Sequence, residues 1–212
     1  MAPIPTPIYH ITHVKNLLTI VREGRLDSYI RLQAGAGTYV NIAHSNIQDR
    51  RATTRVSCGP GGVLHEYVPF YFAPRSPMLF AIKQGRVATY EEGQDPVVYL
   101  TSTAQAVQAA GLPFVFCDGH GTMSLTDFYD DLASLDQIDG VVMAAKYWAD
   151  TVEDGDRCRR RQAEFLVHRF FPWTLITGVG VRTKGLLAQV QQCIASVAHK
   201  PDVRLRPDWY YA

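Results

Sequence analysis

Short apolar segments of strand composition recur along this chain, and segments with helical spacing separate most of them. The expected strands are residues 8–14, 68–72, 97–102, 114–118, 163–170, 176–181 and 203–206, and the expected helices are residues 14–23, 76–85, 103–111 and 184–198. No linker rich in Pro, Gly or Ser divides the chain into halves. The pattern therefore predicts a single domain over residues 1–212, of the mixed α/β or α+β class.

Two long stretches interrupt this alternation, at residues 25–66 and 119–161. The first is rich in Gly, Ser and Asn, and the second holds only short acidic helical pieces around residues 127–135. A loop of such length inside a compact domain is usually either functional or disordered. We expect the first stretch to be a functional loop.

The charges of the chain nearly cancel, since 21 Lys and Arg residues face 20 Asp and Glu residues for a formal net charge of +1. A strongly basic surface that binds any polyanion is therefore excluded, and nucleic acid would have to meet a local patch. No apolar run approaches the roughly 18 to 20 residues that span a bilayer, which excludes membrane insertion. The start, MAPIPTPIYH, lacks the pattern of a secretory signal, so the default expectation is a cytoplasmic protein.

No metal site or common phosphate-binding loop is evident in the spacing of the residues. The four cysteines lie far apart without a CxxC motif, so we expect reduced thiols and neither a disulfide framework nor a zinc site. His10 and His13 have the spacing of a metal pair, but an odd separation on a strand directs them to opposite faces. Close to Gly178 and Gly180, Thr183 stands where a dinucleotide fingerprint needs Gly, which disfavours a Rossmann site.

Arginines gather in two places, and each group has two interpretations. Arg50, Arg51 and Arg55 are either solvated side chains or a clamp for phosphate groups, which the planar guanidinium binds in a bidentate way. Glu164 follows the arginine run at residues 157–161 and opens an apolar strand. A carboxylate at the start of a strand and beside cations is a candidate catalytic group. The alternative is a structural carboxylate at the strand edge that pairs with those arginines.

Four segments carry motifs that occur together, and in the same order, in a known family. They are IYHITHVKNLLTIVREG (8–24), IQDRRATTRV (47–56), VPFYFAPRSPML (68–79) and RRQAEFLV (160–167). With these segments the chain resembles the DarT family of DNA ADP-ribosyltransferases, the toxins of bacterial toxin–antitoxin pairs. The resemblance implies an α+β ADP-ribosyltransferase fold in which two small sheets, with flanking helices, meet at a cleft that binds NAD.

The resemblance also implies a reaction and a partner. ADP-ribose would be moved from NAD onto a thymidine base of single-stranded DNA. The partner would be a macrodomain antitoxin that removes the modification and shields the toxin. The R-S-E pattern of arginine-modifying toxins is absent, because residues 161–164 read RQAE, and this disfavours a protein arginine as the acceptor.

Nine residues of this sequence match family positions for NAD binding or catalysis. NAD binding would involve His10, Ile11, Thr12, His13, Thr19, Asp27, Arg51 and Tyr71. The catalytic residues would be Glu164 and Arg51.

The two catalytic candidates suit the implied chemistry. Cleavage of the nicotinamide bond develops positive charge on the ribose, which the carboxylate of Glu164 can stabilise. If a ring nitrogen of thymine attacks, a base must also take its imide proton. Glu164 could do so while Arg51 polarises a thymine carbonyl or binds the pyrophosphate, and the sequence leaves open which of the two accepts the proton. Single-stranded DNA is the reasonable substrate, because base pairing hides this edge of thymine.

The second long stretch, residues 119–161, offers a further contact surface for DNA. Tyr129, Tyr147 and Trp148, together with four arginines, could stack on bases and contact phosphates, although core packing is the alternative for Trp148.

Two other functions stay open. An NAD-dependent RNA 2′-phosphotransferase also begins with a strand, a histidine and a helix, but its full set of RNA-binding basic residues is not found in this sequence. A non-catalytic nucleic-acid-binding module would explain the arginines and aromatic residues but not a lone Glu164 at the start of a strand.

Overall fold

The first strand runs directly into the first helix, as the sequence predicts. The computed structural model describes residues 3–35 and 39–212, in which β1 spans Pro7–His13 and α1 spans Val14–Glu23. His13 caps the helix, because its Nδ1 accepts a hydrogen bond from the backbone N–H of Lys15. Gly24 ends the helix with a φ of 67°, a left-handed conformation that glycine adopts without strain.

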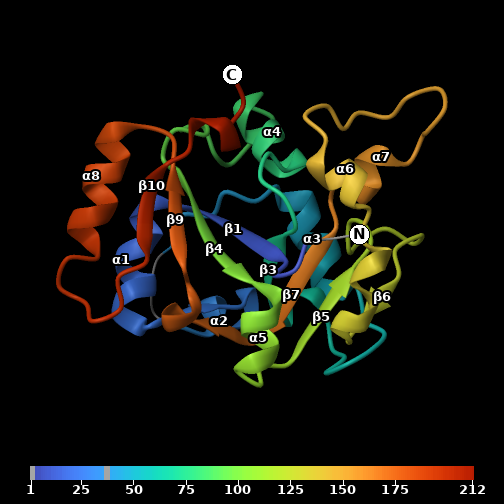
Figure 1. Cartoon of the computed structure of the whole chain (residues 1–212), viewed down its shortest axis with the longest axis horizontal. Helices are drawn as coiled ribbons and strands as arrows, with labels where there is room; N and C mark the ends of the chain where they lie inside the picture. Colours follow the sequence, from blue (N-terminus) through green and yellow to red (C-terminus); the bar gives the residue numbers. More distant parts are fainter. Residues whose placement is uncertain (1–2, 36–38) are drawn as a thin grey trace.

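Eight strands form one sheet in the order β10-β9-β4-β1-β3-β7-β5-β6, which runs from left to right in Figure 1. Besides β1, these strands are β3 (Tyr67–Tyr71), β4 (Val97–Thr103), β5 (Phe114–Cys117), β6 (Phe128–Tyr129), β7 (Glu164–His168), β9 (Gly178–Val181) and β10 (Asp202–Leu205). Neighbouring strands are antiparallel except β9 and β10, which are parallel.

The sheet has little backbone pairing at one place, between β1 and β3. There the register contains one pair, Tyr9 opposite Tyr71, whereas β1 pairs with β4 along its whole length from Pro7 to His13. The sheet thus consists of two four-stranded halves that meet at β1 and β3. The break in pairing leaves room for a cavity at this junction.

A second sheet holds only two strands, β2 (Arg25–Asp27) and β8 (Phe170–Pro172). The α+β class expected from the sequence is confirmed, but the expected pair of small sheets is not what the strands form. The two halves of the main sheet are joined through the pairing of β3 with both β1 and β7, so they count as one large sheet.

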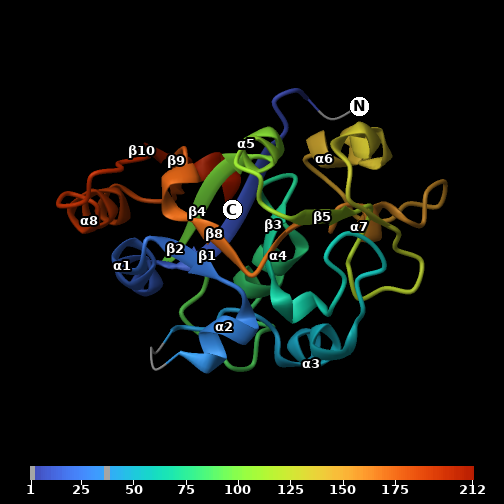
Figure 2. The ribbon, with the colours of Figure 1, turned by 90° about the horizontal axis from the view of Figure 1, so that it is seen from below.

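Two helices lie where the sequence predicts a long loop, and that expectation is wrong for them. They are α2 (Tyr29–Ala34) and α3 (Ser45–Thr53), which Figure 2 shows together on one side of the sheet, opposite α5 and α6. α3 reads SNIQDRRAT and is polar almost all round, so no apolar stripe of helical period marks it. Tertiary contacts stabilise it instead, through Arg51 with Glu164 and Gln48 with His65.

Three further helices begin within one residue of their expected positions, because side-chain caps define where they begin. Ser76, Thr103 and Thr183 cap α4 (Pro77–Lys83), α5 (Ala104–Ala109) and α8 (Lys184–Cys193), respectively. Two short helices, α6 (Gly140–Ala144) and α7 (Arg157–Arg160), lie in the stretch 119–161. Short 3₁₀ turns lie at Leu64–Glu66, Leu132–Gln137, Trp173–Leu175 and Pro207–Trp209.

Apolar side chains pack on both faces of the main sheet. On one face, Leu17 of α1 and Val190 of α8 belong to the same buried cluster as Phe70 of β3. On the other face, Leu79 of α4 packs with Tyr99 of β4. Within residues 3–35 and 39–212, no helix is long and apolar enough to cross a membrane.

Candidate active site

A cavity of about 340 Å³ lies at the junction of β1 and β3. Its walls are completed by α1, α2, α3, α4 and the segment 39–44. Eight of the nine expected site residues line it, namely His10, Ile11, Thr12, Thr19, Asp27, Arg51, Tyr71 and Glu164. Its volume is in the range of roughly 300 to 1,000 Å³ that small-molecule sites occupy.

The expected catalytic residues, Arg51 and Glu164, form a buried ion pair at the cavity wall. Nη1 of Arg51 donates to both carboxylate oxygens of Glu164, at 2.9 and 2.7 Å, and the two residues are 8% and 3% exposed. Burial by itself would lower the pKa of Arg51, but the charge and hydrogen bonds of Glu164 raise it above its usual value. Glu164 therefore pairs with an arginine of α3, and not with the arginines that precede it in sequence.

The second terminal nitrogen of Arg51 is buried and has no hydrogen-bond partner within the described chain. A buried donor that stays unpaired costs free energy, so such groups in native proteins call for an explanation. Arg51 lines the cavity, so its guanidinium lies at the wall that a ligand there would meet. Nδ1 of His44, another residue of the cavity wall, is also buried without a partner.

His10 and Tyr71 stand on the two strands that meet at the cavity. Nδ1 of His10 donates to the carbonyl of Pro69 at 2.7 Å, and burial lowers the pKa of His10 to about 4. The ring is therefore neutral, and its Nε2 is left as an acceptor. Burial, and next the charge of Glu164, raise the pKa of Tyr71, whose backbone lies opposite Glu164 in the sheet.

Asn16 connects α1 to the segment 39–44 and was not predicted as a site residue. Its side-chain amide donates to Oγ1 of Thr12 at 3.0 Å and to the carbonyl of Val40 at 2.9 Å, and its oxygen accepts from the N–H of Val40 at 2.7 Å. Asn16 thus pairs with the backbone of the cavity wall as another strand would. Its partner Thr12 lies in β1 and not in α1, so no helical spacing in the sequence marks Asn16 as a site residue.

His13 is the one expected residue that the structure keeps away from the cavity. Its ring is buried, caps α1 through Nδ1, and places Nε2 3.4 Å from the carboxylate of Glu92. The alternation of side chains along β1 directs His13 to the face opposite His10, and at the last position of the strand its Nδ1 caps α1. His13 therefore fixes the start of α1 and does not join His10 in the cavity.

Two further histidines line the cavity without having been assigned a role from the sequence. The ring of His65 packs against that of Tyr29 in a tilted arrangement, with ring centroids 4.2 Å apart, and its Nε2 lies 2.8 Å from the side-chain oxygen of Gln48. Nδ1 of His120 accepts from the N–H of Thr122 at 3.2 Å, so its Nε2 carries the proton of the neutral ring. Burial lowers the pKa of both histidines, and both are therefore neutral hydrogen-bonding groups at neutral pH.

The aromatic residues of the stretch 119–161 differ in how much of them is available for stacking. Tyr129 stacks on Phe116 of the sheet, and Trp148 donates to the hydroxyl of Tyr211 at 3.0 Å. Tyr147, by contrast, is 75% exposed. The core-packing alternative therefore describes Trp148, and Tyr147 is the aromatic side chain of the three that is free to meet a base.

With eight of the nine expected residues at one cavity, the fold and the site place this chain among the ADP-ribosyltransferases. A family model described as "ssDNA thymidine ADP-ribosyltransferase, DarT" matches residues 9–211, and the chain belongs to that family. A DNA ADP-ribosyl transferase of Thermus sp. (strain 2.9) is 46% identical over 211 residues, which cover 99% of this chain and 98% of the relative.

Solved structures of Thermus sp. 2.9 DarT have the same fold as this chain. The complex with ADP-ribosylated ssDNA has a TM-score of 0.92 at 46% identity, covering 100% of this chain and 99% of that one. The complex with NAD⁺ has a TM-score of 0.89 at 43% identity and covers 100% of both chains. These findings favour the DNA transferase over the RNA phosphotransferase and over a non-catalytic module.

In the described residues, no group of three or more His, Cys, Asp or Glu side chains could hold a metal ion.

Proposed function

We propose that this chain transfers ADP-ribose from NAD onto thymidine bases of single-stranded DNA. The observation that carries the proposal is the buried pair of Arg51 and Glu164 at the wall of a cavity that the expected NAD-binding residues also line. Two structures of the Thermus sp. 2.9 relative support the proposal. One, 46% identical to this chain, is a complex with ADP-ribosylated single-stranded DNA, and the other, 43% identical, is a complex with NAD⁺.

The residues of the cavity fit NAD as co-substrate, which supplies the ADP-ribosyl group and nicotinamide as the leaving group. The unpaired Nη2 of Arg51 offers a charged donor to an oxygen of the pyrophosphate or of the ribose. His10 and Thr12 supply polar groups on β1, and Thr19 and Asp27 supply others beside α1. Tyr71 is the aromatic residue that we assign to the nicotinamide ring.

Glu164 stabilises the positive charge that develops on the ribose as the nicotinamide bond breaks. Because Arg51 already binds both of its oxygens, Glu164 is held as a carboxylate in a fixed position and needs no reorganisation during the reaction. The same carboxylate is the base to which we assign the imide proton of thymine, since a guanidinium that stays protonated cannot accept one.

The acceptor strand would meet the protein next to this cavity. Residues 119–161 end three residues before Glu164, and Tyr147 in this stretch exposes its ring. An exposed aromatic ring supports stacking with an unpaired base.

We also retain two expectations from the family resemblance: a macrodomain antitoxin would be the partner, and the chain would act as the toxin of that pair. The cytoplasmic location stays an expectation from the start of the sequence, which lacks the pattern of a secretory signal. The continuous main sheet, with strands from both ends of the chain, supports a single domain over residues 1–212.

The proposal is tested by incubating the protein with NAD and separate pools of single-stranded DNA, duplex DNA, RNA and protein. We expect only the single-stranded DNA to gain the mass of ADP-ribose, and only when the oligonucleotide contains thymine. A gain of mass on RNA or protein, or on DNA without thymine, would contradict the proposed acceptor.

A further inference from the structure

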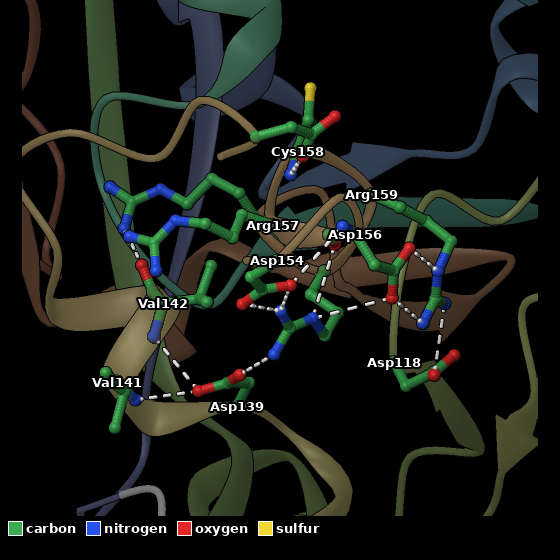
Figure 3. A network of polar contacts seen from close by, with 12 residues as sticks. Asp118, Asp139, Val141, Val142, Asp154, Asp156, Arg157, Cys158 and Arg159 are labelled. Carbon is green, nitrogen blue, oxygen red and sulfur yellow. Dashed lines mark hydrogen bonds and ion pairs between the residues drawn. The ribbon is translucent and has the colours of Figure 1, made fainter. Parts of the chain in front are cut away.

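Arg159, in the run that precedes Glu164, is bound by two carboxylates from different parts of the chain. Its Nη1 donates to Oδ2 of Asp118 at 3.1 Å, and its Nε and Nη2 donate to the two oxygens of Asp156 at 2.7 and 2.8 Å. Figure 3 shows this arrangement, with Asp118 and Asp156 both against the guanidinium of Arg159. The side chain of Arg159 is 12% exposed, so little of it faces solvent.

The neighbouring arginines are also occupied by protein groups. Arg160 pairs with Asp139 and Asp154, and Arg161 donates to the carbonyls of Pro74 and Val142, each at 2.7 Å. A guanidinium whose charge is matched by carboxylates, or whose donors are used by carbonyls, adds little attraction for phosphate. Arg159, Arg160 and Arg161 are therefore poor contacts for DNA phosphates, contrary to what the sequence suggested for them.

Asp118 connects Arg159 to the position of Glu164. It follows Cys117, the last residue of β5, and Cys117 lies directly opposite Glu164 in the pairing of β5 with β7. The ion pair of Arg159 with Asp118 thus closes a ring that runs through Cys117 and Glu164 and returns through residues 160–163. Glu164 is the first residue of β7, so this ring fixes the end of the strand that carries the catalytic candidate.

The packing around Gly119 indicates that this arrangement depends on shape as well as charge. A Cβ atom at Gly119 would lie 2.9 Å from Cγ of Arg159, would also meet its Nη1, and would come within 3.1 Å of Oγ1 of Thr126. The side chain of Arg159 therefore lies flat across the backbone that follows β5. Only a residue without a side chain leaves it that path.

We propose that Arg159 is a positioning residue for Glu164, acting through Asp118, and not a contact for the phosphates of DNA. The inference rests on the proposed function for its activity readout, but the position of Glu164 can be measured without any substrate. Arg159 and Asp118 restrict where β7 begins and so keep the carboxylate of Glu164 against Nη1 of Arg51.

The test uses the full chain with Arg159→Gln, Asp118→Asn and Gly119→Ala. Gly119→Ala is the sharpest of these, because it displaces the guanidinium while leaving every charge in place. Asp202→Asn is the matched control, since its exposed ion pair with Arg204 lies on β10, away from the cavity. Circular dichroism checks the fold of each variant, and if Arg159→Gln does not fold, the other two carry the test.

Single-turnover transfer is measured at saturating NAD and single-stranded DNA, together with DNA affinity at several salt concentrations. We expect each variant to lower the transfer rate by roughly 10- to 100-fold, as small displacements of a catalytic group do. DNA affinity and its salt dependence should stay at the wild-type values, and Arg159→Lys should recover part of the rate. The double variant Arg159→Gln/Asp118→Asn should be no slower than the slower single variant.

Two outcomes of the rate and affinity measurements would overturn the inference. One is a loss of DNA affinity in Arg159→Gln, with a salt slope shallower by about 0.7 and an unchanged saturated rate, which would identify a phosphate contact. The other is an unchanged saturated rate in all three folded variants.

Crystal structures of the variants give a readout that does not depend on the reaction. We expect Glu164 to have moved out of hydrogen-bond distance of Arg51 in Gly119→Ala and Asp118→Asn. If Glu164 moves but the wild-type protein does not transfer ADP-ribose, the proposed function fails and the positioning role stands. An unmoved Glu164 in both variants would refute the positioning role.

Discussion

The ion pair of Arg51 with Glu164 and the network around Arg160 use the same side-chain chemistry in two different settings. The first is a single pair between residues 113 positions apart, and both of its members are almost fully buried. The second surrounds one arginine with Asp139, Asp154 and Asp156, all of them partly open to solvent. In the buried pair, loss of either partner leaves an uncompensated charge and lowers stability strongly. In the network, other carboxylates and water compensate Arg160 when one carboxylate is lost.

This difference explains why the buried pair is the candidate catalytic group and why the network around Arg160 has a structural role. A buried carboxylate held by one arginine is screened little by water, so its charge acts more strongly on a neighbouring group than the charge of an exposed carboxylate does. Water and ions screen a partly exposed network. Its main contribution is therefore to hold the conformation of the stretch 119–161, and its electrostatic effect on the cavity is small.

Removing the charge of Glu164 should have the largest effect of any change considered for either region. We expect Glu164→Gln to lower single-turnover transfer by roughly 10²- to 10⁴-fold, because a positioned base and a charge that stabilises the transition state are both lost. The amide keeps an oxygen that accepts from Arg51, so the variant should fold, which circular dichroism checks. Glu23→Gln, at the exposed end of α1, is the control, and near-wild-type transfer by Glu164→Gln would return Glu164 to a structural role.

Truncating Arg51 breaks the same pair from the other side. We expect Arg51→Ala to lower the free energy of unfolding by about 3 to 5 kcal/mol, since it leaves a buried carboxylate without a partner. Urea titration measures this effect, with the exposed neighbour Arg50→Ala as the control.

The same Arg51→Ala variant separates binding from chemistry. If Arg51 mainly binds NAD, the thermal stabilisation that NAD gives the wild type should shrink in the variant, and its defect in transfer should shrink at saturating NAD. A transfer defect of the same size at all NAD concentrations would contradict a binding role.

Acid should distinguish the two regions by the pH at which each loses stability. His10 has a pKa of about 4 in the folded chain against 6.5 in the unfolded chain, so the unfolded state takes up a proton first as the pH falls. Stability linked to His10 is thus complete above pH 6.5 and is lost toward pH 4, at up to about 1.4 kcal/mol per pH unit.

Asp154 and Asp156 have a pKa held below 3.8, chiefly by their hydrogen bonds from Arg160 and Arg159, so their contribution is lost only below that pH. Urea titrations from pH 8 to 3, with His10→Gln beside the wild type, check this order. We expect a shallower slope in His10→Gln above pH 4 only. An identical slope would contradict the buried, neutral state of His10.

The smallest effect is expected from Asp154→Asn in the network. Arg160 keeps Asp139 and Asp156 as partners, so the melting temperature should fall only slightly, and less than in Arg51→Ala. The difference from wild type should also diminish at high salt, because exposed pairs are screened. A loss as large as that of Arg51→Ala would show that the network is not tolerant of single changes.

The periodicity of the sequence was sufficient to predict most of the described strands, together with α1, α4, α5 and α8, because their apolar residues face a core. It did not predict α2, α3, α6 or α7. The start of α1 after His13 and the strand that begins near Glu164 were predicted within one residue. The resemblance added the site residues, eight of which line one cavity. Patterns of this kind are local, so they survive without knowledge of the fold.

The tertiary structure alone decided the features that depend on partners distant in sequence. α3 has no apolar stripe, and its helical state follows from contacts such as that of Arg51 with Glu164. The run of arginines before Glu164 suggested either its ion-pair partners or a DNA patch, yet Arg159 and Arg160 face other carboxylates. Charge is visible in a sequence, but the partner of a charge is set by which segments the fold brings within a few ångströms, and that is a property of the whole chain.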